Sequence, residues 1–328
     1  MPRTTMEDVA REAGVSRALV SLAYRNLPGV SEATREHILE VGRRLRYTPN
    51  RVAARLAENS GNTIGVFLQD LHNDLSADIF DGVREVADRA GKTLVLTVGA
   101  SDGAGDRSAL DTLKQSRVDV AIATGLLMPD SEVLEFSRDL PLVLVTRQVE
   151  GVDSSYSDDV ESGRIATEYL IRTGHRKIVF LANPPVDGYR GRREGYLTAM
   201  QRAGFPEAVV QTGWTRADAA RDIDAVLGST DRPTGIFAHN DQAALGVLDA
   251  LSARGLRAGV DVSVIGHDNT AGSMLPGAAL TTVDMHGRDL GRRAAEIALQ
   301  RLEDPAAPAH ESVSVPTLVR RETTAPLL

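Results

Sequence analysis

The sequence of 328 residues contains no cysteine, and aromatic residues make up only 4% of it. Without cysteine there can be no disulfide, thiol nucleophile or thiolate metal site, a composition that suits the reducing cytoplasm. No uninterrupted apolar run is long enough to cross a bilayer, and the N-terminal segment is charged rather than apolar. We therefore expect a cytoplasmic protein with no membrane partner.

Familiar catalytic patterns are absent as well. The sequence has no Ser-His-Asp order, no histidine-rich metal spacing, no Walker loop and no Gly-x-Gly-x-x-Gly fingerprint, and the glycine-rich stretch 99–105 lacks that spacing. The histidines are scattered, and His175 fits a structural turn better than a catalytic role. The sequence thus predicts no catalytic residue, metal or cofactor.

Charge is distributed unevenly along the chain. Residues 1–60 hold ten Arg, no Lys and seven acidic residues, a net charge of +3, whereas the remainder holds 27 basic and 38 acidic residues, a net charge of −11. A basic N-terminal segment on an acidic body favours contact between that segment and a polyanion such as DNA.

Two short helical patterns meet at a tight turn near the N-terminus. The first, 6–13, begins with a capping box formed by Thr4 or Thr5 with an acidic residue three positions on. Gly14 permits the turn, and Ser16 can cap a second helix over 17–24. This pattern predicts a DNA-binding helix-turn-helix with 17–24 as recognition helix, although small helical bundles also contain such turns.

A third helical pattern follows and completes a small core. It opens at Ser31 with Thr34, ends near Tyr47, and cannot continue past Pro49. Its apolar positions can pack on those of the first two helices: Ile38, Val41 and Leu45 on Val9, Ala10, Val20 and Ala23. The run 50–59 places Val52 and Leu56 on one helical face, but it is too short to be helical unless a partner orders it.

From residue 62 the pattern changes to apolar strands that alternate with amphipathic helices. Strands are predicted at 63–68, 93–98, 118–123 and 142–145, then at 177–181, near Val209, at 235–238 and at 262–265, with a last one near 313–315. A helix is predicted over 287–302. Two such series indicate two α/β lobes with parallel sheets and a cleft between them.

Polar residues follow several strands of the second series. Ligands of open parallel sheets bind at the carboxyl ends of strands, and here those positions hold Asn183, Asn240, Asp241, Asp268 and Asn269. With Arg192 early on a helix, they suit a polyhydroxylated ligand that needs fixed donors and acceptors. Alternatively, an Asn such as Asn240 only caps the helix that follows it.

Several motifs together resemble the LacI (lactose repressor) family of bacterial transcription regulators. They include Asp8-Val9-Ala10, Ala13-Gly14-Val15-Ser16, Tyr47-Thr48-Pro49-Asn50, Phe237-Ala238-His239-Asn240-Asp241 and Val264-Ile265-Gly266-His267-Asp268. The resemblance covers nearly the whole chain. It implies an all-α helix-turn-helix headpiece followed by a two-lobed α/β core like that of periplasmic binding proteins. It also implies operator DNA and a small-molecule effector, such as a sugar, as partners of a homodimer.

The same resemblance implies boundaries and site residues. The headpiece would span 1–49, the hinge helix and linker 50–61, the first lobe 62–160 plus 287–318, and the second lobe 161–286 plus 319–328. DNA contacts would come from Thr5, Ser16, Arg17, Ala18, Ser21, Arg25, Ser31, Thr34, Tyr47, Asn50, Arg51, Ala53 and Leu56, with Leu56 wedged into the minor groove. Effector contacts would come from Asn73, Arg192, Trp214, Asn240 and Asp268.

The chain also departs from the family on both recognition surfaces. Leu19 and Leu22 replace a threonine and an arginine of the recognition helix, which reduces the expected base contacts to Arg17, Ala18 and Arg25. His267 and Asn269 replace an aromatic residue and an acid beside Asp268, and the segment 73–76 lacks the usual Pro-Phe pair. The sequence therefore predicts an effector-controlled regulator, with a carbohydrate-binding protein or enzyme that carries a helical appendage as the alternative.

Overall fold

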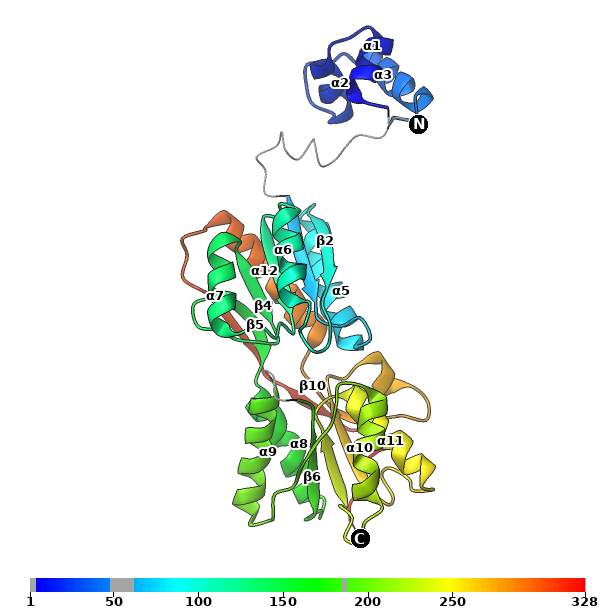
Figure 1. Ribbon diagram of the computed structural model, residues 1–328, viewed down its shortest axis with the longest axis vertical. Helices are drawn as coiled ribbons and strands as arrows, with labels where there is room; N and C mark the ends of the chain where they lie inside the picture. Colours follow the sequence, from blue (N-terminus) through cyan, green and yellow to red (C-terminus); the bar gives the residue numbers. More distant parts are fainter. Residues whose placement is uncertain (1–3, 48–61, 185–187, 328) are drawn as a thin grey trace. The chain divides into compact units, whose positions relative to one another are not determined.

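The structure, a computed structural model, describes residues 4–47, 62–184 and 188–327. The chain divides into two compact units, 1–60 and 61–328, which are described one at a time (Figure 1). The predicted DNA contacts of Asn50, Arg51, Ala53 and Leu56 lie outside the described residues.

The N-terminal unit contains α1 (Met6–Ala13), α2 (Arg17–Tyr24) and α3 (Glu32–Arg44). The capping box forms at Thr5: the Asp8 amide donates to Thr5 Oγ1 at 3.3 Å, and the Thr5 amide donates to Asp8 Oδ2 at 2.9 Å. Gly14 has a φ of 66°, which a tight corner between two helices requires. The predicted helix-turn-helix is therefore confirmed in its local structure.

The core of this unit is the one predicted from helical spacing. Val9, Val20 and Ile38 are fully buried, and Ala10, Ala13, Ala23 and Val41 nearly so. Leu19 and Leu45 pack against this cluster from its edge. Burial of an aliphatic side chain of this size contributes about 1.5–3 kcal/mol, so three such side chains at the centre of the unit hold the helices together.

The first lobe of the second unit is a parallel sheet with helices on both faces. Its strand order is β11-β5-β4-β3-β1-β2, and the strands are β1 (Thr63–Leu68), β2 (Thr93–Val98), β3 (Val120–Thr124), β4 (Leu142–Val145), β5 (Asp153–Ser157) and β11 (Glu311–Ser314). Helices α5 (Asp74–Arg89) and α12 (Gly287–Glu303) pack on one face. Helices α6 (Asp106–Gln115) and α7 (Asp130–Asp139) pack on the other.

The second lobe repeats this architecture. Its strand order is β12-β10-β9-β8-β6-β7, and the strands are β6 (Ile178–Ala182), β7 (Val209–Gln211), β8 (Gly235–Ala238), β9 (Ser263–His267), β10 (Thr281–Asp284) and β12 (Thr317–Val319). Helices α8 (Asp159–Arg172) and α9 (Tyr189–Ala203) cover one face, and α10 (Arg216–Leu227) and α11 (Asp241–Ala253) the other. A short 3₁₀ helix, η1 (Ala271–Met274), follows β9.

The polypeptide passes between the lobes at three places among the described residues: from β5 to α8, from β10 to α12, and from β11 to β12 (Figure 1). Helix α8 therefore starts at a crossover. The lobe boundary predicted after residue 318 falls inside β12, which belongs to the second sheet.

Three strands were missed by the sequence prediction, and one pairing differs from it. Strand β12 runs antiparallel to β10, so the prediction of parallel sheets is wrong at this edge. Strands β5, β10 and β12 were not predicted because they lack continuous apolar runs. Strand β5 has the sequence DSSYS, and its buried Asp153 accepts two hydrogen bonds from Arg301 at 2.8 and 2.9 Å. Such partners allow a polar strand to lie in the interior.

Glycines bring the helices of each lobe into close contact. A Cβ atom at Gly195 of α9 would lie 2.1 Å from the carbonyl oxygen of Val160 in α8, and one at Gly163 would lie 2.1 Å from that of Arg192. In the first lobe, a Cβ at Gly291 of α12 would lie 2.0 Å from the carbonyl oxygen of Ile79 in α5. Only glycine fits at these crossings, and the α8–α9 crossing sets the position of Arg192.

Candidate functional site

The recognition helix α2 presents its first residues to solvent. Arg17 and Ala18 are exposed, and Arg25, at the C-terminal end, is exposed as well. Ser21 is half-buried, and its carbonyl accepts a hydrogen bond from Arg25 Nε at 3.4 Å. Leu19 packs on the headpiece core. The exposed positions are thus Arg17, Ala18 and Arg25, the three residues that the sequence analysis retained as expected base contacts.

Four of the hydroxyl residues predicted to contact DNA lie at helix N-termini. Thr5, Ser16 and Ser31 cap α1, α2 and α3 respectively, and Thr34 Oγ1 lies 2.7 Å from Ser31 Oγ. Helix N-termini attract phosphate because their first amides have no partner within the helix and the dipole is positive there. The capping roles of Thr5, Ser16 and Ser31 are therefore compatible with contacts to the DNA phosphates.

Tyr47 packs edge-on against Tyr24, with ring centroids 5.3 Å apart. Partial burial raises the pKa of Tyr47, and the positive charge of Arg17 opposes this shift.

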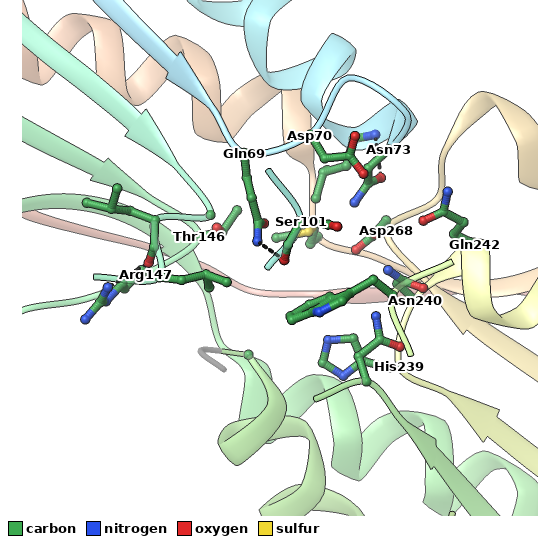
Figure 2. Close-up of a pocket in the computed structure, with 18 of the residues that line it drawn as sticks. Gln69, Asp70, Asn73, Ser101, Thr146, Arg147, His239, Asn240, Gln242 and Asp268 are labelled. Carbon is green, nitrogen blue, oxygen red and sulfur yellow. Dashed lines mark hydrogen bonds between the residues drawn. The ribbon is translucent and has the colours of Figure 1, made fainter. Parts of the chain in front are cut away.

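A pocket in the second unit lies between the lobes, at the carboxyl ends of both sheets (Figure 2). All five predicted effector residues, Asn73, Arg192, Trp214, Asn240 and Asp268, line it. The first lobe adds residues that the sequence analysis missed: Gln69, Asp70, Ser101, Thr146 and Arg147. Most of the residues that line it have polar side chains, among them amides, carboxylates and guanidinium groups.

Arg192 is held in place by two hydrogen bonds. It is buried, its Nε donates to Asp159 Oδ1 at 2.8 Å, and its Nη1 donates to the carbonyl oxygen of His239 at 2.7 Å. Asp159 is the first residue of α8 and so adjoins a crossover between the lobes. The ion pair neutralises the guanidinium and fixes its orientation, as a site for an uncharged polar ligand requires.

Asn240 and Asn73 each cap a helix and also line the pocket. Asn240 Oδ1 accepts from the Ala243 amide at 2.8 Å and caps α11, and Asn73 Oδ1 accepts from the Leu75 amide at 3.1 Å and caps α5. Both residues nevertheless line the pocket. Their caps occupy the oxygens, so the amide NH₂ groups are the parts left to donate to a ligand.

Two of the polar residues that were predicted to face the ligand instead form hydrogen bonds inside the second lobe. Asp241 accepts from Thr282 Oγ1 at 2.6 Å and from the Thr270 amide at 2.7 Å, and does not line the pocket. Burial raises the pKa of Asp241, and these hydrogen bonds oppose the shift. Asn269 is bonded to Asp284 and Arg321. The expectation that the polar residues after the second-lobe strands all face the ligand is therefore wrong for Asp241 and Asn269.

Unpaired polar atoms mark the floor of the pocket. Asn183 and His239 are buried, and among the described residues neither Asn183 Oδ1 nor His239 Nδ1 has a hydrogen-bond partner. Burial lowers the pKa of His239 far below its ordinary value, so the ring is neutral. Trp214 is half-buried beside them. Asn183 Oδ1 and the neutral imidazole of His239 can form hydrogen bonds with hydroxyl groups of a ligand. The indole of Trp214 can pack against an apolar face of a ligand ring.

One sequence signal could have found the missed first-lobe residues. Gln69, Ser101 and Thr146 come shortly after the predicted first-lobe strands, as Asn183 and Asn240 do in the second lobe. Gln69 Nε2 donates to the Ser101 carbonyl at 3.1 Å, which joins two of these strand ends (Figure 2). The rule for strand ends holds for both sheets, although it was applied only to the second.

The residues that the structure describes contain no helix that is both long and apolar enough to span a membrane. The same residues contain no group of three or more His, Cys, Asp or Glu side chains arranged to hold a metal ion.

Comparison with known proteins places both units in one family. Residues 5–50 match the model of bacterial regulatory proteins of the lacI family, and residues 167–324 match a periplasmic binding protein-like domain. The HTH-type transcriptional repressor PurR of Vibrio vulnificus is 32% identical over 97% of this chain and 98% of its own.

Solved structures agree with this assignment. The lac repressor dimer bound to operator and the anti-inducer ONPF is 28% identical, with a TM-score of 0.84 over 99% of this chain and 100% of that one. The complex of the regulator CelR with cellobiose is 26% identical, with a TM-score of 0.73 over 98% and 100% of the two chains. The chain therefore belongs to the LacI family, and it is a DNA-binding transcriptional regulator.

Proposed function

We propose that this regulator is a repressor whose affinity for DNA is set by a small polyhydroxylated metabolite bound in the pocket between its lobes. The observation that carries the proposal is Arg192, a buried guanidinium held by Asp159 and the His239 carbonyl at the pocket wall. Asn240 and Asp268 lie in the same wall, and Trp214 offers a ring face. Sugars present hydroxyls to such donors and acceptors and an apolar face to an aromatic ring.

The charge of the pocket favours an uncharged ligand. Arg192 is paired with Asp159, and Arg147 is paired with Asp130 and also donates to two backbone carbonyls. Neither guanidinium therefore has an uncompensated charge for a phosphate or carboxylate. The complex of CelR with cellobiose gives a relative in which a neutral sugar is the ligand.

For DNA, we propose contacts from Thr5, Ser16, Arg17, Ala18, Ser21, Arg25, Ser31, Thr34 and Tyr47, together with Asn50, Arg51, Ala53 and Leu56 from the hinge. Arg17 is exposed at the start of the recognition helix and has the length to reach O6 and N7 of a guanine. The lac repressor binds its operator as a dimer. A homodimer of this chain would require a nearly palindromic operator, because a two-fold axis relates the headpieces.

The proposed control is a linkage between ligand and DNA. A ligand that changes the relation of the two lobes also changes the surfaces that support the hinges, and with them the free energy of folding residues 50–59 on DNA. Within this scheme we assign the headpiece to 1–49 and the hinge and linker to 50–61. The first lobe comprises 62–160 plus 287–318 and the second lobe 161–286 plus 319–328, except that β12 belongs wholly to the second lobe. We also propose a cytoplasmic location and no enzymatic activity.

The test is an operator titration. An operator fragment is first selected from random DNA with the purified full-length protein, and then titrated at one salt concentration with and without neutral sugars, sugar phosphates and nucleosides. We expect sequence preference and a shift of the apparent dissociation constant with one neutral sugar or polyol. Absence of any preference over random DNA would refute the DNA-binding role, and a response to phosphates alone would refute the assigned ligand class.

The alternative, an enzyme or carbohydrate-binding protein with a helical appendage, makes a different prediction. Removal of residues 1–60 should then leave turnover of the ligand intact, whereas a regulator should retain ligand binding without turnover. Relatives that match along the whole chain, headpiece included, favour the regulator.

A further inference from the structure

Asp268 lies in the pocket wall in an unusual environment. Its carboxylate is buried, and its backbone has a φ of 111°, followed by Asn269 with a φ of 58°. This backbone region is unfavourable for residues other than glycine, so the surrounding contacts must hold these two consecutive residues in place. Asn269 supplies one set of contacts, because its Nδ2 donates to Asp284 at 3.0 Å and its Oδ1 accepts from Arg321 at 2.6 Å.

His267 supplies the contact on the other side. It is fully buried, and its Nδ1 lies 2.7 Å from Asp268 Oδ1. Its Nε2 lies 3.9 Å from Asp159 Oδ1 and has no hydrogen-bond partner among the described residues. If Nε2 carried the proton, a contact near 3 Å with the carboxylate would be expected. The distances therefore indicate that the proton is on Nδ1 and is donated to Asp268.

The charged groups around this pair come from several elements. Arg192 of α9 faces both groups, Asp159 of α8 and Asp284 of β10 face them from other elements, and His239 after β8 and Asp241 of α11 adjoin them. Burial lowers the pKa of His267 well below its ordinary value, and Arg192 lowers it further, so the imidazole is neutral. Burial raises the pKa of Asp268; Arg192 opposes this shift, but Asp159 and Asp284 add to it, so the pKa of Asp268 lies above its ordinary value. Of these neighbours, Arg192 is the one that favours the ionised carboxylate.

We propose that His267 is a positioning residue of the ligand site: its Nδ1–H binds Asp268 Oδ1 and leaves Oδ2 as the acceptor that faces the ligand. Among the described residues, Oδ2 has no hydrogen bond within the protein, and Asp268 lines the pocket. The ligand part of this inference rests on the proposed function. The hydrogen bond, the tautomer and the ionisation of Asp268 do not.

The first experiment determines the tautomer in the full-length protein labelled with ¹⁵N-histidine. The His267 resonances are identified by their loss in His267→Asn. We expect the Nδ1–H tautomer at pH 8, where the Asp268 carboxylate can accept this proton. His175 is an internal reference for the opposite tautomer, because its Nε2 lies 3.1 Å from the Ala325 carbonyl, which can only accept. An Nε2–H tautomer or an imidazolium at His267 would overturn the proposal.

The second experiment follows the Asp268 carboxyl carbon by ¹³C labelling, with Asp268→Asn for assignment. Loss of a hydrogen bond to a buried carboxylate weakens its ionised form about tenfold or more. In His267→Phe the midpoint of the Asp268 titration should therefore rise by about one pH unit or more. His267→Asn places an amide donor near Nδ1 and should restore the original midpoint. His175→Asn, which removes a buried histidine of the same lobe, should leave it unchanged.

Equal midpoints in the wild type and His267→Phe would refute the positioning role even if the pocket binds a sugar. If His267→Phe does not fold, two other measurements decide the question. The first is the His267 tautomer in the wild type. The second is the midpoint of the Asp268 titration in His267→Gln, which should rise because glutamine places its amide nearer to the position of Nε2 than to that of Nδ1. Conversely, the predicted tautomer and midpoints together with no ligand response in the operator titration would refute the proposed function and leave the hydrogen bond in place.

Discussion

A methyl group added at Gly195 would test how tightly the α8–α9 contact fixes the ligand site. The Cβ of Gly195→Ala would lie 2.1 Å from the Val160 carbonyl oxygen and 2.6 Å from the Arg164 amide nitrogen. Ordinary contact begins at 3.4 Å, so the difference between 3.4 and 2.1 Å requires a displacement of about 1.3 Å. Because both obstructing atoms belong to the backbone, no side-chain rotation can relieve the overlap.

The expected effect follows from two opposing free energies. Overpacking costs roughly 1–3 kcal/mol, and the rigid neighbours place this substitution at the upper end. Replacement of glycine by alanine inside a helix stabilises the helix by about 1 kcal/mol. The net loss is therefore about 2 kcal/mol, which lowers the Tm of a lobe of this size by roughly 4–8 °C. Arg192 is one turn earlier on α9, and its hydrogen bond to Asp159 should lengthen with the same displacement.

The assay compares Gly195→Ala with Gly291→Ala. The second variant meets the Ile79 carbonyl oxygen at 2.0 Å in the first lobe, where it should cost similar stability without moving α9. Urea denaturation measures the free energy of unfolding, and an operator titration measures the response to effector. We expect similar destabilisation in both but a weaker response only in Gly195→Ala. A loss below 0.5 kcal/mol, or equal responses, would show that the packing argument is wrong.

Further predictions concern single side chains. Leu56→Ala should weaken operator binding and leave effector affinity intact, as measured by DNA titration and thermal shift. Asp268→Ala should abolish the effector response but not DNA binding; a normal response would restrict Asp268 to a structural role. Arg301→Met leaves the buried Asp153 without its ion pair and should cost about 3 kcal/mol in urea denaturation, whereas Arg216→Met, at an exposed pair with Asp249, should cost under about 0.5. Burial lowers the pKa of His175 in the native protein. As pH falls through 6.5, His175 therefore binds a proton in the unfolded chain but stays neutral in the native protein, which favours unfolding. Relative to His175→Gln, the wild type should lose up to about 1 kcal/mol by pH 5.5; parallel stability curves would contradict this.

The headpiece could be predicted in detail because its signals are local. A cap at Thr5, a left-handed Gly14 and a cap at Ser16 each depend on residues within three positions in the sequence. The apolar spacing of Ile38 and Val41 then identified the core. Local backbone preferences and helical periodicity agree in this unit, so no tertiary contact overrides them.

The polar strands could not be predicted because their partners are remote in the sequence. Ser155 of β5 is buried and donates to the Leu290 carbonyl at 3.0 Å, and Thr281 of β10 accepts from the Arg321 amide at 2.9 Å. Hydrophobic patterning assumes that buried strands are apolar. Where a buried polar side chain has its partner 40 or 135 residues away, as in these two pairs, that assumption fails and the strand has no local signal in the sequence.

In the pocket, the residue types that follow the strands predicted a polar site, but they did not predict which of the side chains line it. Asn240 and Asp241 are adjacent and follow the same strand, yet Asn240 lines the pocket whereas Asp241 is bonded to Thr270 and Thr282 inside the lobe. Asp241 begins α11, and threonine hydroxyls from neighbouring segments satisfy its carboxylate. Which member of a polar pair faces the ligand thus depends on partners supplied by other elements.

The ligand site and the crossovers between the lobes share side chains, and this has a consequence for signalling. Arg192 is bonded to Asp159 at the start of α8, and Asn269, next to Asp268, is bonded to Asp284 at the end of β10. Both carboxylates adjoin segments that connect the lobes. A ligand that pulls on Arg192 or Asp268 therefore acts on two crossovers through single hydrogen bonds. Each such bond is worth about 1.5–3 kcal/mol where a charge is involved, which is comparable with the coupling free energy of 1–3 kcal/mol typical of allosteric proteins. Transmission from the pocket to the lobe connections thus needs no further intermediate element.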